Sequence, residues 1–295
     1  MIDVVGFGES SVDYVHVVPE LPRPGVAKLP IASHYSSYGG QVATTMAACA
    51  ALGLSSGYLG AVGADDIGRR IRDELKRRGV DLSRLVVREA ATRYAVILVE
   101  QQRGDRLVLS GRDRGLDLPP DEITSSLVAG ARVVHVDATD EAASIEIARR
   151  GREAGATVTC DVEAVTGRTP ELLSHVTVPI LAEAVPQALT GVTGVEPALR
   201  ALRCRHRGML CVTLGERGAA ALDGEQFVYV PGVQVNAVDT TGAGDIFRAG
   251  FIYGVLRAWP IERTLRFASA AAAIGCTRRG AIDSVPALDE VERSL

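Results

Sequence analysis

Short apolar runs alternate with segments of helical period along most of the chain. The runs at residues 133–136 and 209–214 are mostly apolar, which is typical of strands buried on both faces of a sheet. Alternation of such strands with helices predicts an α/β fold with a mostly parallel central sheet. Further strands are predicted from residue 4 and at residues 57–62, 157–161 and 178–181, and helices at residues 41–52, 66–78, 144–154 and 197–203.

Two segments break this alternation. Residues 14–38 carry four prolines and show no helical period, and residues 92–112 read as two apolar runs joined by a polar turn. We expect them to form a small antiparallel sheet that projects from a core made of residues 1–13, 39–91 and 113–295. The apolar face of such a lid needs a cover, which is provided by closure over a substrate or by pairing with a second subunit. The alternative is a pair of surface hairpins packed on the core.

Bulk properties narrow the class of protein. No apolar run among the 295 residues approaches the length of a membrane span, and the N-terminus lacks a basic region followed by a hydrophobic stretch, so a cytoplasmic protein without membrane contact is expected. The basic residues of 69–78 fall at helical spacing without interleaved aromatic residues, which predicts a solvated helix face and no nucleic-acid partner. The five cysteines form no C-x-x-C pair and are expected to be reduced.

The string Asp-Thr-Thr-Gly-Ala-Gly-Asp at residues 239–245 stands directly before a predicted amphipathic helix. Gly242, Ala243 and Gly244 offer backbone N–H groups that have no acceptor within the helix, and such a terminus attracts anions. The carboxylate of Asp245 would repel a phosphate unless its task is to accept a proton from a hydroxyl group. The string therefore indicates phosphoryl transfer to an alcohol; the alternative is an ordinary capped helix with an acid in its first turn.

Two places in the chain carry acidic or neutral polar residues that suit a polyhydroxylated substrate. Asp13 follows the first strand, where a carboxylate can accept two hydrogen bonds from a sugar or can simply cap a turn. Gly39 and Gly40 precede the alanine-rich helix and allow close approach of the backbone, while Gln41 and Thr44 offer neutral hydrogen-bonding groups on one helical turn. The Gly-Phe-Gly after the first strand lacks the third glycine of a dinucleotide fingerprint.

Taken in order, these motifs resemble those of the ribokinase-like (PfkB) carbohydrate kinases over nearly the whole chain. The resemblance implies a three-layer α/β sandwich with a β lid, and transfer of the γ-phosphoryl group of ATP, with Mg²⁺, to a primary hydroxyl of a small sugar. Asp245 would be the catalytic base and the amides of residues 242–244 the anion hole. The sugar-binding residues implied are Asp13, Gly39, Gly40, Gln41 and Thr44.

The resemblance also assigns the nucleotide site. Thr213-Leu-Gly215-Glu-Arg-Gly218 matches a Thr-x-Gly-x-x-Gly strand end that flanks nucleotide, and residues 270–280, which end at Gly280, would run beside the adenine. A homodimer formed through the lid is expected.

The chain departs from the family pattern at two positions. Where the family often has Asn-x-x-Glu, Glu183 is kept but Ala182 and Val185 replace the Asn and the later Glu, so Glu183 would contact Mg²⁺ only through water. Arg248 stands where a small or neutral side chain is usual, either contacting phosphate or lying on the helix surface. Asp239 is expected to hold the loop, near the place where some relatives bind a monovalent cation such as K⁺.

The substrate remains open at this point. Residues 268–280 and the pattern around Asp161 and Glu163 look closer to ketohexokinase and sulfofructose-kinase members than to ribokinase, which favours a ketohexose-like sugar over a pentose. A nucleoside or vitamin kinase of the same fold is an alternative. A non-catalytic sugar- or nucleotide-binding relative is another, supported by the altered Asn-x-x-Glu and opposed by the intact Asp245.

Overall fold

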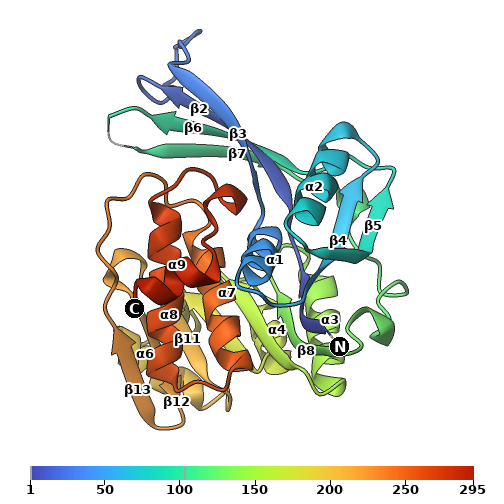
Figure 1. The fold of residues 1–295 in the computed structure, drawn as a ribbon, viewed down its shortest axis with the longest axis vertical. Helices are drawn as coiled ribbons and strands as arrows, with labels where there is room; N and C mark the ends of the chain where they lie inside the picture. Colours follow the sequence, from blue (N-terminus) through green and yellow to red (C-terminus); the bar gives the residue numbers. More distant parts are fainter. Residues whose placement is uncertain (1, 103) are drawn as a thin grey trace.

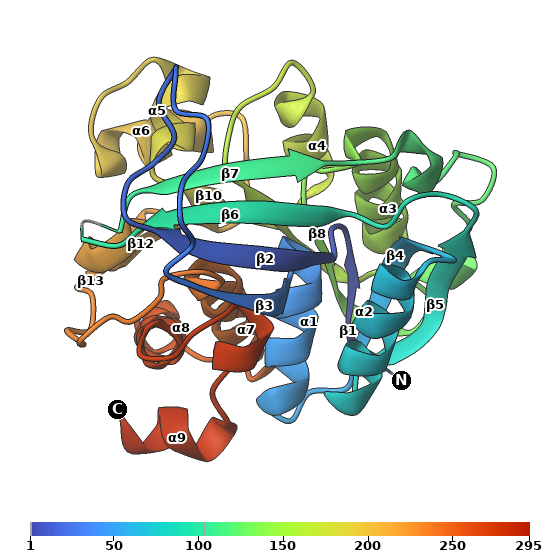
Figure 2. The same ribbon diagram turned by 90° about the horizontal axis from the view of Figure 1, so that it is seen from above.

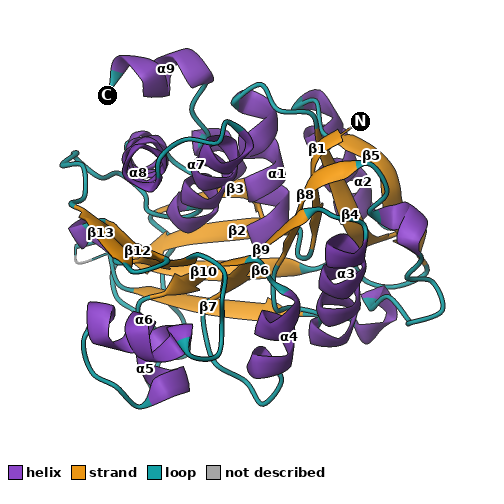
Figure 3. Cartoon of the chain, turned by 90° about the horizontal axis from the view of Figure 1, so that it is seen from below, coloured by secondary structure: helices purple, strands orange, loops and turns teal. Residues whose placement is uncertain are grey.

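The aliphatic runs form a central nine-stranded sheet in the computed structural model, which describes residues 2–102 and 104–295. The strand order is β13-β12-β11-β10-β9-β8-β1-β4-β5, and all neighbours from β11 to β5 are parallel. Helices α1, α7 and α8 cover one face and α3 to α6 the other, which gives the three layers predicted (Figures 1 and 3). The strands are β1 Ile2–Phe7, β4 Ser56–Gly63, β5 Asp81–Arg88, β8 Ala131–Val136, β9 Thr157–Val162, β10 Val178–Ala182, β11 Leu210–Thr213, β12 Ala219–Asp223 and β13 Gln226–Val230. The helices are α1 Gln41–Ala51, α2 Asp66–Arg77, α3 Glu141–Glu153, α4 Thr169–His175, α5 Ala184–Thr190, α6 Val195–Arg203, α7 Ala243–Leu256, α8 Ile261–Cys276 and α9 Leu288–Arg293.

The sequence pattern missed the strands at the two edges of this sheet. β5 alternates exposed and partly buried residues, and β12 and β13 form an antiparallel hairpin beyond the last parallel strand. Edge strands lack the uninterrupted apolar run on which the other assignments depend. None of the helices within the described residues is both long and apolar enough to span a bilayer.

The sequence predicted that helix α7 is amphipathic, and this prediction is wrong. Every residue of the helix from Asp245 to Gly254 is buried. Phe247 and Phe251 pack against β10, β11 and β12, whereas the residues of the opposite face pack against α1 and α8. The helix lies between two hydrophobic clusters, so a polar side chain on it faces protein rather than solvent.

The lid is a four-stranded sheet of order β3-β2-β6-β7, formed by β2 Ser11–Val18, β3 Ser33–Gly39, β6 Tyr94–Glu100 and β7 Arg106–Gly111. It extends across one end of the core (Figures 1 and 2). The expected antiparallel sheet is in fact mixed, because β2 and β6 run parallel. The boundary drawn after residue 13 also falls inside a strand: Asp13 belongs to the lid and not to the end of β1.

The lid presents two distinct faces, because side chains alternate along a strand. On the face that carries Asp13, Val15 lies beside Ile97 of β6, and Ile97 lies beside Val108 of β7. On the opposite face, Leu107 and Leu109 of the edge strand β7 are 38% and 55% exposed. The face with Leu107 and Leu109 is open, and Val108 on the Asp13 face is 53% exposed as well, so β7 carries exposed apolar side chains on both faces.

Candidate active site

The candidate site lies where the strand order of the sheet reverses. From β1 the chain proceeds outward through β4 to β5, and later through β8 to β9 and β10 on the other side, so the carboxyl ends of β1 and β8 lie side by side at Phe7 and Val136. Crevices at such points are the usual ligand sites of open α/β sheets. Helices α1 and α7 begin at the same edge.

Residues 239–244, called the anion loop below after the role predicted for them, include a backbone conformation that favours glycine. Gly242 caps α7 with a φ of 79°, and a Cβ atom there would lie 2.8 Å from the Cβ of Ala281. The amide of Ala243 donates to the carbonyl of Thr240 at 3.3 Å, whereas the first-turn amide of Gly244 has no acceptor within the helix. The loop therefore presents donors to a ligand at the start of α7.

Asp239 holds this loop in place. Its carboxylate accepts hydrogen bonds from the amide and hydroxyl of Thr241, at 2.9 and 2.7 Å, and from the amide of Gly280 at 3.0 Å. From the lid, Arg106 donates to Asp239 at 3.3 Å and to the hydroxyls of Thr240 and Thr241 at 3.0 and 2.9 Å. Arg106 of the lid strand β7 thus contacts the loop of residues 239–241 that precedes α7.

Asp245 stands in the first turn of α7 and is only 9% exposed. Burial raises the pKa of its carboxyl group well above the ordinary value, while the Arg248 guanidinium acts in the opposite direction. The expectation that Arg248 lies on the helix surface is wrong: the side chain is buried beneath the loop and forms an ion pair with Asp161 of β9. Contact of Arg248 with phosphate stays a prediction. The buried carboxylate of Asp245 therefore lies beside a buried cation, with 3.8 Å between Nη1 of Arg248 and the nearer carboxylate oxygen.

The two glycines before α1 are explained by close contacts. Asp13 is buried in β2, accepts a hydrogen bond from the hydroxyl of Ser11 at 2.9 Å, and has a pKa that burial raises. A Cβ atom on Gly39 would lie 2.6 Å from the Asp13 carboxylate. Gly40 has a φ of 94°, and its Cβ would lie 2.5 Å from the carbonyl oxygen of Glu9. Larger residues would displace Asp13 or the chain after β1.

Helix α1 brings the Asp13 side of the site to the anion loop. Gln41 begins the helix and is half-buried. The hydroxyl of Thr44 is buried and has no hydrogen-bond partner among the described residues, although its methyl group lies close to Gly242. The Thr45 hydroxyl approaches the carbonyl oxygen of Asp245 at 3.3 Å. The Thr44 hydroxyl thus lies unpartnered and fully buried between α1 and the start of α7, which is unusual for a polar group.

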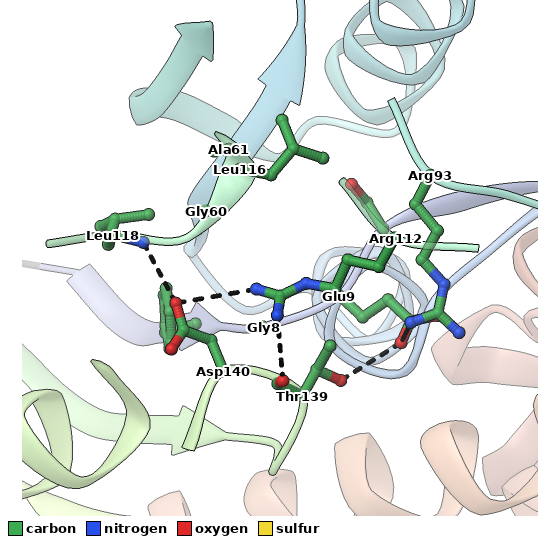
Figure 4. A pocket seen from close by; sticks show the side chains of 12 residues that line it. Gly8, Glu9, Gly60, Ala61, Arg93, Arg112, Leu116, Leu118, Thr139 and Asp140 are labelled. Carbon is green, nitrogen blue, oxygen red and sulfur yellow. Dashed lines mark hydrogen bonds and ion pairs between the residues drawn. The ribbon is translucent and has the colours of Figure 1, made fainter. Parts of the chain in front are cut away.

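Sequence reasoning missed a group of charged residues beside Asp13. Glu9, after β1, forms an ion pair with Arg93 and accepts a hydrogen bond from the Thr139 hydroxyl at 3.2 Å (Figure 4). The amide of Glu9 donates to Asp137 at 2.7 Å. Burial raises the pKa of Glu9 to about 7, against the effect of Arg93. Glu9, Arg93, Thr139 and Arg112 line a cavity of about 40 Å³. In the sequence, Glu9 stands out only as part of the Gly-Phe-Gly-Glu string after the first strand. That string was considered only as a dinucleotide-binding motif, which it does not match.

A larger pocket unites the predicted nucleotide residues with the anion loop. It has a volume of about 430 Å³ and is lined by Thr213, Gly215 and Gly218 at one end and by Ala243 and Gly244 at the other. This volume lies in the range of small-molecule sites. Its α8 wall consists of Ser269, Ala272, Ala273 and Cys276. Gly280, also predicted to contact nucleotide, instead donates its amide to Asp239 and does not line this pocket.

Residues 1–288 match the sequence model of the pfkB family carbohydrate kinases. The chain belongs to this family. It is 28% identical over 291 residues to the ribokinase of Haemophilus influenzae, covering 96% of this chain and 95% of that protein. It is 31% identical over 301 residues to the ATP-dependent ribose-1-phosphate kinase of Halopiger xanaduensis, covering 100% and 98%. The structure of Arabidopsis thaliana ribokinase complexed with ribose and ATP matches with a TM-score of 0.87 and 27% identity, covering 99% and 98% of the two chains.

As a pfkB kinase the protein is a phosphotransferase, and both the predicted family and the predicted fold are confirmed. Its departures from the family pattern have structural consequences. Val185 is buried in the core and offers no ligand where the family has Glu. The Glu183 side chain is 52% exposed and forms an ion pair with Arg217, next to the pocket residues Gly215 and Gly218.

Proposed function

We propose that this protein transfers the γ-phosphoryl group of ATP to a primary hydroxyl group of a small sugar, a pentose or a ketohexose. One observation carries the proposal. Asp245, a buried acid at the start of α7, directly follows Gly244, which lines the pocket of about 430 Å³, and its backbone carbonyl accepts a hydrogen bond from Thr45 of α1, the helix that begins after Gly39 and Gly40 beside Asp13. A nucleotide on one side and a sugar on the other would bring a phosphate and a hydroxyl to the same carboxylate.

In this mechanism Asp245 accepts the proton of the attacking hydroxyl as the new P–O bond forms. The N–H groups at the start of α7 stabilise the charge on the transferred group, and Asp13, Gln41 and Thr44 orient the sugar. The loop held by Asp239 keeps those N–H groups fixed. The inner face of the lid, with Val15, would exclude water and so limit hydrolysis of ATP.

The proposal includes Mg²⁺ bound with the nucleotide and considers a K⁺ site at Asp239. No group of three or more metal-ligating side chains exists among the residues that the structure describes, which fits a Mg²⁺ held mainly by nucleotide phosphates and water. When bound, Mg²⁺ would neutralise phosphate charge. Of this chain's residues, Glu183 would reach its water shell after leaving Arg217. A K⁺ site at Asp239 is less well supported, because that carboxylate is surrounded by donors and Arg106.

A phosphorylated pentose is a second candidate acceptor. Arg93 and Arg112 face the cavity beside Glu9, and the ribose-1-phosphate kinase of Halopiger xanaduensis is 31% identical to this chain. Each guanidinium is already paired with a carboxylate, Arg93 with Glu9 and Arg112 with Asp117, so a phosphate would have to displace these partners. The neutral sugar is therefore the first candidate.

The test is a panel of acceptors assayed for ADP release and for phosphorylated product. Ribose, fructose, ribose 1-phosphate and a purine nucleoside separate the pentose, ketohexose, sugar-phosphate and nucleoside alternatives. We expect product with ribose or fructose at rates well above hydrolysis of ATP alone. ADP release that is unaffected by every acceptor would contradict the proposal and favour a non-catalytic relative.

We also propose a homodimer that pairs the open faces of two lids. Leu107 and Leu109 give the edge strand an apolar, exposed side, which soluble monomers usually avoid. With ATP as co-substrate, the cytoplasm is the proposed compartment.

A further inference from the structure

Arg248 lies on α7 one turn after Asp245 and is buried, with only 3% of its side chain exposed. One terminal nitrogen, Nη2, donates to the carboxylate of Asp161, and the other, Nη1, lies 3.8 Å from a carboxylate oxygen of Asp245. Nη1 also lies directly beneath the anion loop, because a Cβ atom on Gly244 would come within 2.5 Å of it. The guanidinium thus bridges two carboxylates from different elements.

This arrangement is poorly optimised for stability alone. Burial of an arginine and two carboxylates carries a large desolvation cost, which full hydrogen bonding partly offsets. Here Nε of Arg248 and Oδ2 of Asp161 have no hydrogen-bond partner among the described residues. A buried network with unused donors and acceptors needs another reason to exist.

The charges that surround Asp245 indicate that reason. Asp161 and Glu163 from β9 and its following turn, and Glu9 after β1, all raise the pKa of Asp245, in addition to the effect of burial. Arg248 acts in the opposite direction. His135 of β8 contributes no positive charge, because burial and Arg248 lower its pKa to about 3.

Asp161 in turn holds the arginine. The buried carboxylate raises the pKa of Arg248, and the neighbouring Asp137 disfavours the charged form of Asp161, so Asp161 depends on Arg248 as its counter-charge. The thiol of Cys160 stays neutral, because burial raises its pKa to about 12. The pair is therefore mutually dependent.

We propose that Arg248, held by Asp161, is a positioning residue that orients the carboxylate of Asp245 and keeps it charged for proton acceptance. The proposal rests on the proposed function, in which Asp245 is the base. It assigns Arg248 a role that acts through Asp245, and it predicts opposite effects for removal of the cation and for removal of the Asp161 carboxylate.

The experiment compares the pH dependence of kcat/KM for Arg248→Met, Arg248→Lys, Asp161→Asn and, as a matched control on the exposed face of α8, Arg266→Met. Without the cation, Asp245 is protonated at higher pH, so the acidic limb of Arg248→Met should move up by about one pH unit or more. Asp161→Asn removes a negative neighbour and leaves Arg248 to Asp245, so its limb should move down by about half a unit. Arg248→Lys should keep the limb within about half a unit of wild type while lowering kcat about tenfold, since a single ammonium holds the carboxylate less well.

A merely structural pair would lower the stability of all three variants and leave every limb where wild type has it, and that result would overturn the proposal. The proton affinity of Asp245 can also be measured without substrate, by NMR titration of ¹³C-labelled aspartate carboxyl groups in the whole protein. If wild type phosphorylates no acceptor, the proposed function fails. An upward shift of the Asp245 titration in Arg248→Met would still support the electrostatic coupling, and an unchanged titration would refute it.

Discussion

Replacing Glu9 with glutamine is expected to stabilise the folded protein at alkaline pH. Glutamine keeps the shape of the side chain and an oxygen that can accept from Arg93 and Thr139. It removes a carboxylate whose pKa is raised to about 7 from an ordinary 4.5, chiefly by burial. A group with a raised carboxyl pKa contributes most stability below pH 4.5, and that contribution is lost as the pH rises through 7.

The size of the effect follows from that difference in pKa, which corresponds to about 3 kcal/mol between fully protonated and fully ionised Glu9. Glu9→Gln should therefore leave the free energy of unfolding nearly unchanged at pH 4.5 and raise it by roughly 2–3 kcal/mol at pH 8. Urea unfolding of wild type and variant at several pH values measures this. Glu292→Gln, at an exposed position on α9, is the matched control.

A stability difference that does not depend on pH would refute this reasoning, because it would mean that Glu9 does not titrate differently in the folded and unfolded protein. Loss of stability at pH 8 would show that the ion pair with Arg93 outweighs the cost of burial.

Three further predictions follow from the lid and the glycines. Arg106→Gln should lower kcat/KM about tenfold in steady-state kinetics, because the lid loses its charged hydrogen bonds to Asp239 and to the hydroxyls of Thr240 and Thr241. An unchanged value would mean that these contacts play no part in turnover. Gly40→Ala, at a φ of 94° and facing the carbonyl of Glu9, should raise the KM for sugar far more than the KM for ATP, and equal changes would contradict the assignment of this side of the site. Leu109→Lys on the open face of the lid should give a monomer by light scattering, whereas a dimer that persists would exclude this face as the interface.

Much of the fold was predictable because its signals are local. The buried parallel strands are recognisable in the sequence as apolar runs. The anion loop is recognisable as a short glycine-containing string before a helix. The edge strand β5 and the hairpin of β12 and β13 were missed. These strands form by pairing with neighbouring strands at the sheet edges, and β5 has no continuous apolar run that would indicate it in the sequence.

The candidate site was predictable to the extent that each residue lies within a motif. Glu9 was missed because its partners Arg93 and Asp137 stand 84 and 128 residues away. Arg248 was assigned to the phosphate or to the surface because its partner in the structure, Asp161 of β9, is 87 residues away in the sequence and meets α7 only in the folded protein. An arginine one turn after the proposed base, together with an acidic residue at the end of a buried strand, is the signal that would have suggested the pair.

The central claim is that Asp245 is the base of a phosphoryl transfer. The most direct measurement compares turnover and ATP affinity for Asp245→Asn with those for Asp289→Asn, an exposed acid on α9. Asp245→Asn should lower kcat by about 1,000-fold or more and change the Kd for ATP by less than about threefold, while Asp289→Asn behaves as wild type. Turnover by Asp245→Asn close to that of wild type would contradict the account.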